Sequence, residues 1–454
     1  MRRLFGTNGI RGIVNQDITP EFALKIGASI GTFFNSGNLI VGRDGRSSGL
    51  MLMNAIISGI TSAGVGVIDI GLAPTPAIQY GVGRIDACGA VVITASHNPP
   101  EFNGIKVAGD DGIELPRKDE EVIEEIYFNE TYRRTPWNEL GSIQKDESLL
   151  DIFIEGVVEK ANADIIKKAN LKVVVDPGNG VGALVTPYLL RKLGCNVITI
   201  NAQVDGNFPG RKPEPTPESL TDLAKTVKAL GADLGVAHDG DADRVIFVDE
   251  KGVIHWGDVS FALIVRKILQ EKLGKIIVTP VASSKLIEDV TNQYGGRLVL
   301  TEVGSIVVAR KLQELNGICG GEENGGIFYA PHQFVRDGAM GATLMVELIA
   351  EERKTLSQLV DELPKYYSFK LKTKCPNNLK DDVMEKIKKE MAKYEPITID
   401  GVKIVLEKGW VLIRPSGTEP LIRCFAETSD EQSAKDLAKW GLNLVEEAIG
   451  TSDL

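Results

Sequence analysis

Cysteine and histidine are scarce in this 454-residue chain, which contains five cysteines and four histidines. Cys88, Cys195, Cys319, Cys375 and Cys424 are far apart, and none has a second cysteine at Cys-x-x-Cys spacing. The sequence therefore indicates neither a disulfide framework nor a zinc site, and a reducing cytoplasm is the simplest location. The first residues turn polar and glycine-rich at once, so we expect no signal peptide.

Long apolar runs are also rare. One segment, residues 47–68, has no charged residue and approaches the length of a membrane span. Polar residues and a glycine pair interrupt it, at Asn54, Ser58, Thr61, Gly64 and Gly66. We expect a buried helix that runs into a strand, and no membrane partner.

Positive charge is in deficit. Lys and Arg number 51 against 62 Asp and Glu, which gives a formal net charge of −11. This balance argues against nucleic acid and anionic membranes as partners, since both attract basic surfaces. An anionic substrate would need locally basic pockets.

A unit of strand, turn, helix and strand recurs three times, which predicts three similar α/β domains with mixed sheets. The first strands are expected at 39–41, 172–175 and 275–278, and the second strands at 65–70, 195–200 and 297–300. A smaller α+β domain follows. We expect four domains around a central cleft, at 1–150, 151–252, 253–365 and 366–454.

A third strand in each unit opens into a distinctive loop. These strands are expected at 90–94, 234–237 and 317–319. Ligands gather beyond the carboxyl ends of strands in α/β sheets, so three equivalent loops from three sheets would face one cleft.

The second of these loops has the pattern of a metal site. Asp239, Asp241 and Asp243 alternate, so their carboxylates can converge on one hard cation, for which we expect Mg²⁺. A calcium EF-hand is the first alternative, because Glu250 falls at its twelfth position. Arg244 occupies the position that requires glycine, and the flanking segments have strand patterns, so we disfavour it.

The first loop carries Ser96, whose hydroxyl is a poor nucleophile without a partner. His97 is adjacent, but no Gly-x-Ser-x-Gly elbow surrounds the serine. A phosphoserine needs no base in the resting state. Its oxygens would complete the metal site of the three aspartates, and Arg244 would offset charge on the transferred phosphoryl group.

Five segments, in this order, resemble the α-D-phosphohexomutases, the family of phosphoglucomutase, phosphomannomutase and phosphoglucosamine mutase. They are FGTNGIRG (5–12), TASHNP (94–99), DGDADR (239–244), GEENGG (321–326) and RPSGTEP (414–420). The resemblance runs from near the first residue to past Arg423. The chain departs from the common family wording at Asn324, where Ser is frequent, at Gly326, where His is frequent, and at Ser305, where some relatives have His.

The resemblance implies roles for the remaining polar residues. Arg11, His97 and Lys106 would face the reacting oxygens, and a Lys106 kept neutral by burial is our candidate base. Glu322 and Asn324, with Gly304, suit sugar hydroxyls. The cradle for the phosphate that does not react comprises Arg414, Ser416, Gly417, Thr418 and Arg423, and Lys285 would add charge.

The implied enzyme is an intramolecular phosphotransferase that interconverts hexose 6-phosphate and hexose 1-phosphate through a hexose 1,6-bisphosphate. Mannose, glucose and glucosamine phosphates all fit, and a strict phosphoglucosamine mutase is the nearest alternative. Two other classes stay open, an aspartyl-nucleophile phosphatase and a non-catalytic sugar-phosphate sensor. Whether the chain forms a homo-oligomer also stays open.

Overall fold

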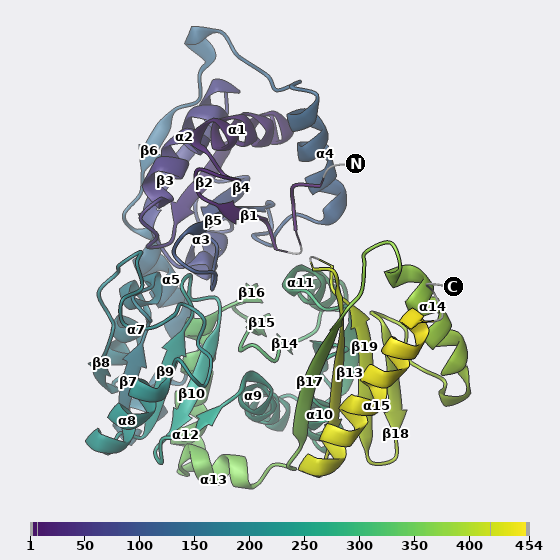
Figure 1. Ribbon diagram of the computed structural model, residues 1–454. Helices are drawn as coiled ribbons and strands as arrows, with labels where there is room; N and C mark the ends of the chain where they lie inside the picture. The colour runs from purple at the N-terminus through teal and green to yellow at the C-terminus, as the bar shows by residue number, and fades with distance from the viewer. Residues whose placement is uncertain (1–2, 7, 418, 451–454) are drawn as a thin grey trace.

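Four units, each built around its own sheet, form this protein (Figure 1). The computed structural model describes residues 3–6, 8–417 and 419–450. Three of the sheets share one strand order, β3-β2-β4-β5-β1, β8-β7-β9-β10-β11 and β13-β12-β14-β15-β16. In each, the first three strands are parallel and the last two antiparallel. The predicted repeat of three mixed α/β units is confirmed.

The first unit adds a sixth strand, β6, beside β3. Its strands are β1 (Ile10–Ile13), β2 (Asn38–Arg43), β3 (Gly66–Leu72), β4 (Gly89–Ile93), β5 (Phe102–Ala108) and β6 (Ile143–Lys145). Its helices are α1 (Pro20–Phe34), α2 (Gly49–Ser62), α3 (Thr75–Gly81), α4 (Arg117–Phe128) and the 3-10 turn η1 (Trp137–Glu139).

The second unit contains β7 (Lys172–Asp176), β8 (Asn196–Thr199), β9 (Leu234–His238), β10 (Val245–Asp249), β11 (Ile254–His255), α5 (Leu149–Val158), α6 (Ala163–Ala169), η2 (Val181–Leu184), α7 (Thr186–Lys192) and α8 (Thr221–Leu230). Its sheet extends to His255, just past the boundary expected at 252.

The third unit contains β12 (Ile276–Pro280), β13 (Arg297–Thr301), β14 (Cys319–Gly321), β15 (Ile327–Tyr329), β16 (Gln333–Arg336), α9 (Gly257–Glu271), α10 (Lys285–Gln293), α11 (Ser305–Glu314), α12 (Gly338–Glu352) and α13 (Leu356–Asp361). The antiparallel fourth unit contains β17 (Tyr367–Lys374), β18 (Val402–Leu406), β19 (Gly409–Pro415), β20 (Leu421–Thr428), α14 (Lys380–Glu390), η3 (Ala392–Tyr394) and α15 (Glu431–Gly450). The smaller α+β end unit is confirmed.

Helix ends follow local sequence. Helix α1 begins where the side chain of Thr19 accepts the backbone N–H of Phe22 at 3.2 Å, with Pro20 in the first turn. It ends at Asn35, whose φ of 64° stops the helix in the left-handed conformation.

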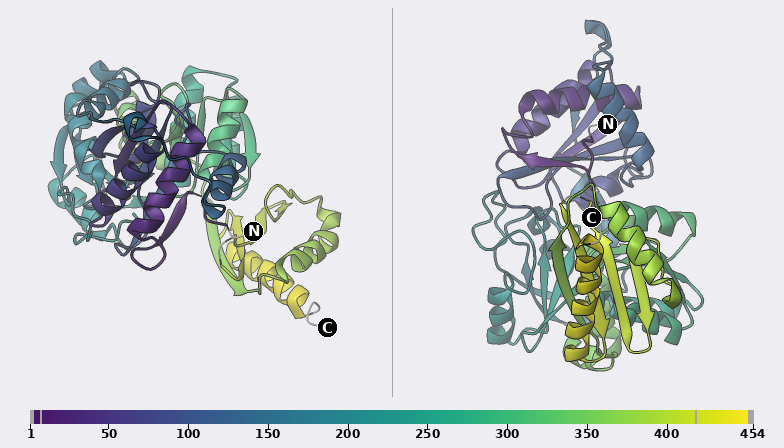
Figure 2. Two further views of the ribbon diagram at one scale, coloured as in Figure 1. Left: turned by 90° about the horizontal axis from the view of Figure 1, so that it is seen from above. Right: turned by 45° about the vertical axis from the view of Figure 1, so that its right-hand side comes forward.

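The second and third units share one apolar core. A single cluster of buried side chains runs from Phe153 of α5 through Phe247 of β10 and Phe261 of α9 to Leu359 of α13. The four units form a curved row that begins with the first unit and ends with the fourth (Figure 2). The fourth unit packs on the third through Val281, Trp410 and Leu412. Three units are therefore joined by apolar packing that fixes where their loops meet.

The uncharged segment 47–68 is helix α2 followed by β3, as expected. Helix α2 packs unusually closely on α1, because a Cβ at Gly59 would lie 2.2 Å from the carbonyl oxygen of Leu24 and 2.5 Å from the amide nitrogen of Ala28. Among the described residues, no helix is long and apolar enough to cross a bilayer.

This close approach predicts the effect of Gly59→Ala. Alanine normally stabilises a helix interior over glycine by about 1 kcal/mol. Here we expect a loss of about 1–3 kcal/mol, since the methyl group would push α1 away. Calorimetry should show a lower unfolding midpoint for Gly59→Ala than for the exposed control Asn54→Ala. An unchanged or raised midpoint would contradict the packing.

Candidate functional site

The aspartate loop follows β9 and forms a compact acidic cluster. One oxygen each from Asp239, Asp241 and Asp243 lies within 4.8 Å of the others, and all three side chains are buried. Ala242 has a φ of 58°, a conformation that costs energy outside glycine and that turns the loop inward. The predicted convergence of the three carboxylates is confirmed.

Burial and mutual repulsion perturb these acids. Burial, together with the charges of Asp241 and Asp243, raises the pKa of Asp239 well above its usual range. Burial also acts to raise the pKa of Asp241, but Lys106 and Thr75 bind this carboxylate and bring its pKa below the usual range. Their donor atoms lie 2.9 and 2.7 Å from Asp241 Oδ2.

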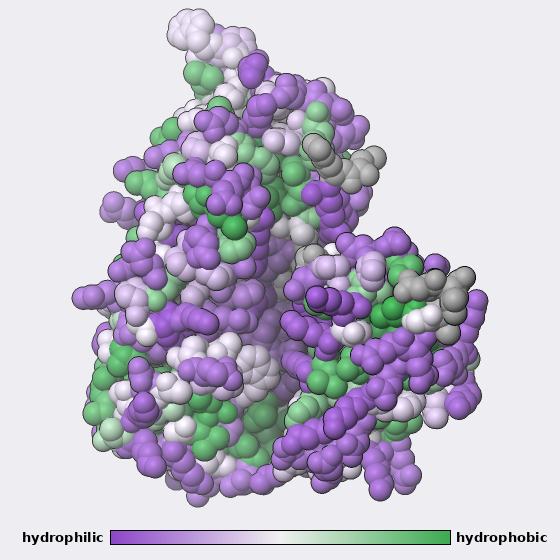
Figure 3. Space-filling model, in the orientation of Figure 1, coloured by the Kyte–Doolittle hydropathy of each residue, from purple (hydrophilic) through white to green (hydrophobic). Residues whose placement is uncertain are grey.

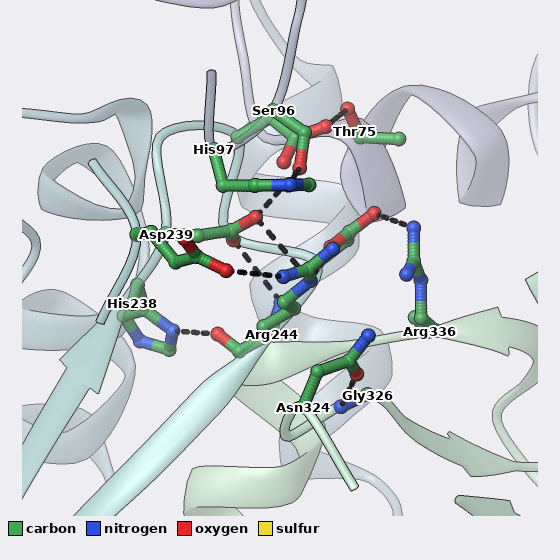
Figure 4. A network of polar contacts seen from close by, with 12 residues as sticks. Thr75, Ser96, His97, His238, Asp239, Arg244, Asn324, Gly326 and Arg336 are labelled. Atoms are coloured by element: carbon green, nitrogen blue, oxygen red, sulfur yellow. Dashed lines mark hydrogen bonds and ion pairs between the residues drawn. The ribbon is translucent and has the colours of Figure 1, made fainter. Parts of the chain in front are cut away.

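Ser96 meets this cluster from the first unit. Its hydroxyl donates to Asp239 Oδ2 at 2.8 Å and lies 3.3 Å from His97 Nδ1 (Figure 4). Ser96 is fully buried and has a φ of 51°, so the loop after β4 holds the serine in a strained conformation of the kind found at functional sites.

Arg46 holds the serine loop in place. Its guanidinium donates to the carbonyl oxygens of Ser96 at 2.9 Å and Asn98 at 2.6 Å, and its Nε pairs with Asp44. Asp44 also accepts the hydroxyl of Thr94, which in turn accepts the amide of Ser96. The strained turn is thus supported by a buried network.

A cavity of about 560 Å³ adjoins the serine and aspartate loops through His97 and Arg244, although Ser96 and the three aspartates are buried and do not line it. Hydrophilic side chains surround the recess between the first and fourth units (Figure 3). All four units line the cavity. Among the residues that the sequence predicted for the site, those that line this cavity are Arg11, His97, Arg244, Gly304, Glu322, Asn324, Arg414, Ser416, Gly417 and Arg423. The size suits a small ligand, and the charge suits an anion.

Basic groups dominate the deep end of this cavity. Arg244 Nε lies 3.8 Å from oxygens of both Asp239 and Asp243. Burial, followed by the charge of Arg244, lowers the pKa of His97 to about 2, so its imidazole is neutral at physiological pH. Burial also lowers the pKa of Arg11 to about 10, which still leaves it charged. The site offers fixed cations and a neutral imidazole.

The cradle of the fourth unit is built on ion pairs. Arg414 Nε donates to Asp400 at 2.6 Å, and Arg423 pairs with Glu419 at 2.8 Å. Lys380 donates to the carbonyl oxygens of Ser416 and Glu419, both at 2.6 Å, and so fixes the loop. Thr418, also predicted here, lies outside the described residues.

The chain matches, in order, the four domains described for phosphoglucomutase/phosphomannomutase. Alpha/beta/alpha domains I, II and III match residues 2–134, 151–252 and 256–367, and the C-terminal domain matches 371–439. The chain belongs to the α-D-phosphohexomutase family. It is therefore a phosphomutase, an isomerase-class phosphotransferase.

Individual relatives are similar over their full length. A phosphoglucomutase/phosphomannomutase from Thermococcus kodakarensis is 47% identical, with 99% of this chain and 100% of the relative covered. A phosphoglucosamine/phosphogalactosamine mutase from Sulfurisphaera tokodaii is 46% identical, with 98% and 100% covered. A solved phosphoglucomutase/phosphomannomutase family protein from Burkholderia thailandensis superposes with a TM-score of 0.89 at 27% identity, with 98% and 97% covered.

Two of the residue expectations need correction. Lys285 does not line the cavity, because its ammonium group pairs with Asp289 one helical turn away, while its backbone N–H donates to Glu427. Lys106 is buried at the site, but the neutral form expected of a base is disfavoured. Burial lowers its pKa, yet the carboxylates of Asp241 and Asp243 outweigh burial and raise the pKa above its usual value.

Sequence reasoning missed several residues of this phosphohexomutase site. Arg336 lines the cavity and pairs with both Asp243 and Glu322. Thr75, Arg46 and Lys380 hold the loops. Arg46 had a detectable signal, because it stands in a charged segment (RDGR, 43–46) at the carboxyl end of the apolar strand β2, where ligand-binding loops of α/β sheets lie.

We predict that the acidic cluster binds Mg²⁺ and that Asp241→Asn lowers its affinity for the ion. We expect affinity for Mg²⁺ to fall by at least about tenfold, because a ligand charge is lost. Titration calorimetry measures this loss. The control is Glu271→Gln in the other acidic group, where Glu271, Glu347 and Glu351 surround Lys267. Equal affinity in Asp241→Asn and wild type, with intact circular dichroism, would exclude the site.

Proposed function

We propose that the chain interconverts hexose 6-phosphate and hexose 1-phosphate through phosphoserine at Ser96. The observation that carries this proposal is the 2.8 Å contact between the Ser96 hydroxyl and Asp239, inside a cluster of three carboxylates under an anion-binding cavity. A serine beside a divalent-cation site, facing fixed arginines, is an arrangement suited to phosphoryl transfer.

The acidic cluster fits Mg²⁺ on its own chemistry. Asp241 Oδ1 and Asp243 Oδ1 are buried and have no hydrogen-bond partner in the described structure. Buried carboxylate oxygens without partners are costly, and a hard cation would satisfy both. Asp239, Asp241, Asp243 and an oxygen on Ser96 would hold the ion. When bound, it would neutralise charge on the transferred phosphoryl group.

Transfer uses both ends of the cavity. The P–O bond at Ser96 breaks as the free hydroxyl of a bound hexose monophosphate takes the phosphoryl group, and the hydroxyl proton ends on Ser96 Oγ, which gives a hexose 1,6-bisphosphate and a free serine. Arg11 and Arg244 stabilise negative charge at this end. The cradle of Arg414, Ser416, Gly417, Thr418 and Arg423 holds the second phosphate. The bisphosphate then reorients within the cavity, and its other phosphate is transferred to Ser96.

Sugar choice rests on Glu322 and Asn324, whose side chains face the cavity. We propose relaxed selectivity for mannose, glucose and glucosamine phosphates, since similar relatives have different substrate names. A strict phosphoglucosamine mutase is the alternative. Coupled assays with each 1-phosphate decide between them, and a preference for glucosamine 1-phosphate above about 10,000-fold, which is the scale set by an obligatory polar contact, would favour the strict enzyme.

Ser96→Ala tests the covalent step. We expect this variant to lose mutase turnover and all phosphate uptake from glucose 1,6-bisphosphate, because no other oxygen takes the place of Ser96 Oγ. Intact-mass spectrometry before and after incubation measures the uptake. Ser58→Ala, an exposed change on α2, is the control and should take up phosphate. Full turnover by Ser96→Ala would refute the assignment.

The same experiment separates the two other classes. An aspartyl-nucleophile phosphatase would release inorganic phosphate and tolerate Ser96→Ala, and a sensor would bind ligand without gaining mass.

The cytoplasmic location and self-association remain predictions.

A further inference from the structure

The side chain of Arg336 fills the space that a side chain at position 326 would need. A Cβ at Gly326 would lie 2.5 Å from Arg336 Cδ and 3.1 Å from its Cγ. The same Cβ would lie 3.0 Å from Glu322 Oε2. The arginine stem therefore crosses the position that a side chain at 326 would take, and only glycine leaves room for it.

The guanidinium at the end of this stem joins two loops. Its Nη1 lies 3.3 Å from Glu322 Oε2 in the loop 321–326, and its Nη2 pairs with Asp243 in the aspartate loop. All three side chains are at least nine-tenths buried, with exposed fractions of 5%, 7% and 2%. Arg336 also lines the cavity, and Figure 4 shows it on the opposite side of Arg244 from Asp239.

The backbone around this pair is equally constrained. Arg244 and Gly326 form an antiparallel bridge between the second and third units. Arg336 ends β16, and the next residue, Asp337, caps α12 by accepting the amide of Met340 at 2.9 Å. The Cα of Arg336 is thus held between a strand and a helix start, which makes its side chain a rigid brace.

We infer that Arg336 is a positioning residue that fixes Glu322 for sugar binding, and that position 326 must be glycine because only glycine leaves room for the Arg336 side chain. This inference rests on the proposed function, because Glu322 is taken as the sugar contact. The planar fork of arginine presents its N–H groups to the two carboxylates along fixed directions, whereas a lysine ammonium donates without fixing those directions. Within the part of the chain that the structure describes, Arg336 is the one side chain that donates a hydrogen bond to the Glu322 carboxylate, so its loss would remove the bond that orients Glu322.

The test is a double-mutant cycle on ligand binding. Titration calorimetry measures the affinity of glucose 6-phosphate and glucosamine 6-phosphate for wild type, Gly326→Ala, Arg336→Ala and the double variant, with Mg²⁺ affinity measured in parallel. We expect each single change to weaken sugar-phosphate binding on the order of tenfold, the scale of one charged hydrogen bond. The double variant should be no weaker than Arg336→Ala, because the clash at 326 disappears with the arginine stem.

Two further variants separate positioning from stability. Arg336→Lys keeps the charge, so Mg²⁺ affinity should stay within about twofold while sugar-phosphate binding falls as in Arg336→Ala. Arg266→Met removes another buried arginine of the third unit, which pairs with Glu362, and should leave both affinities unchanged.

Additive losses in the cycle, or unchanged sugar-phosphate binding in folded Arg336→Ala, would overturn the inference. Failure of the proposed function looks different. Wild type would then bind neither sugar phosphate, or would bind them and never gain phosphate mass on Ser96.

Discussion

Three carboxylates buried within 4.8 Å of one another are the constraint around which this protein is arranged. Removing such charges from water costs several kcal/mol each unless opposite charges accompany them. The compensating cations come from three units, Lys106 from the first, Arg244 from the second and Arg336 from the third. Charge balance in the aspartate loop therefore depends on the docking of all three units.

Backbone contacts reinforce this docking. The amide of Thr75 donates to the carbonyl of Asp241 at 3.0 Å, and the amide of Gly338 donates to that of Ala242 at 3.3 Å. The loop is thus held by the first residues of two helices of neighbouring units, α3 and α12, which explains how it keeps Ala242 in a left-handed conformation. Such support from regular elements is what a site needs to hold its geometry before ligand arrives.

The sequence was informative where a distinctive loop follows a predicted strand. Strand ends placed Ser96 and the aspartates in one cleft although Ser96 and Asp239 are 143 residues apart, and the repeat predicted three equivalent loops. It failed for pairings made by side chains outside those loops. Arg336 meets Asp243 across 93 residues, and Lys106 meets Asp241 across 135, so neither the missed brace nor the charged state of Lys106 was visible. Lys285 is a different error, because its Asp289 partner stands four residues away and is a common helical pairing.

If the protein works as proposed, the two ends of the cavity would bind phosphate with different reserves of charge. In the fourth unit, Arg414 and Arg423 already pair with Asp400 and Glu419. A phosphate there must share arginines with carboxylates, so its net attraction is moderate. At the deep end, positive groups balance the aspartates before any metal is added, and Mg²⁺ would tip that balance toward the anion. The proposed reorientation of the bisphosphate requires release from the cradle, which weaker binding of phosphate there would favour.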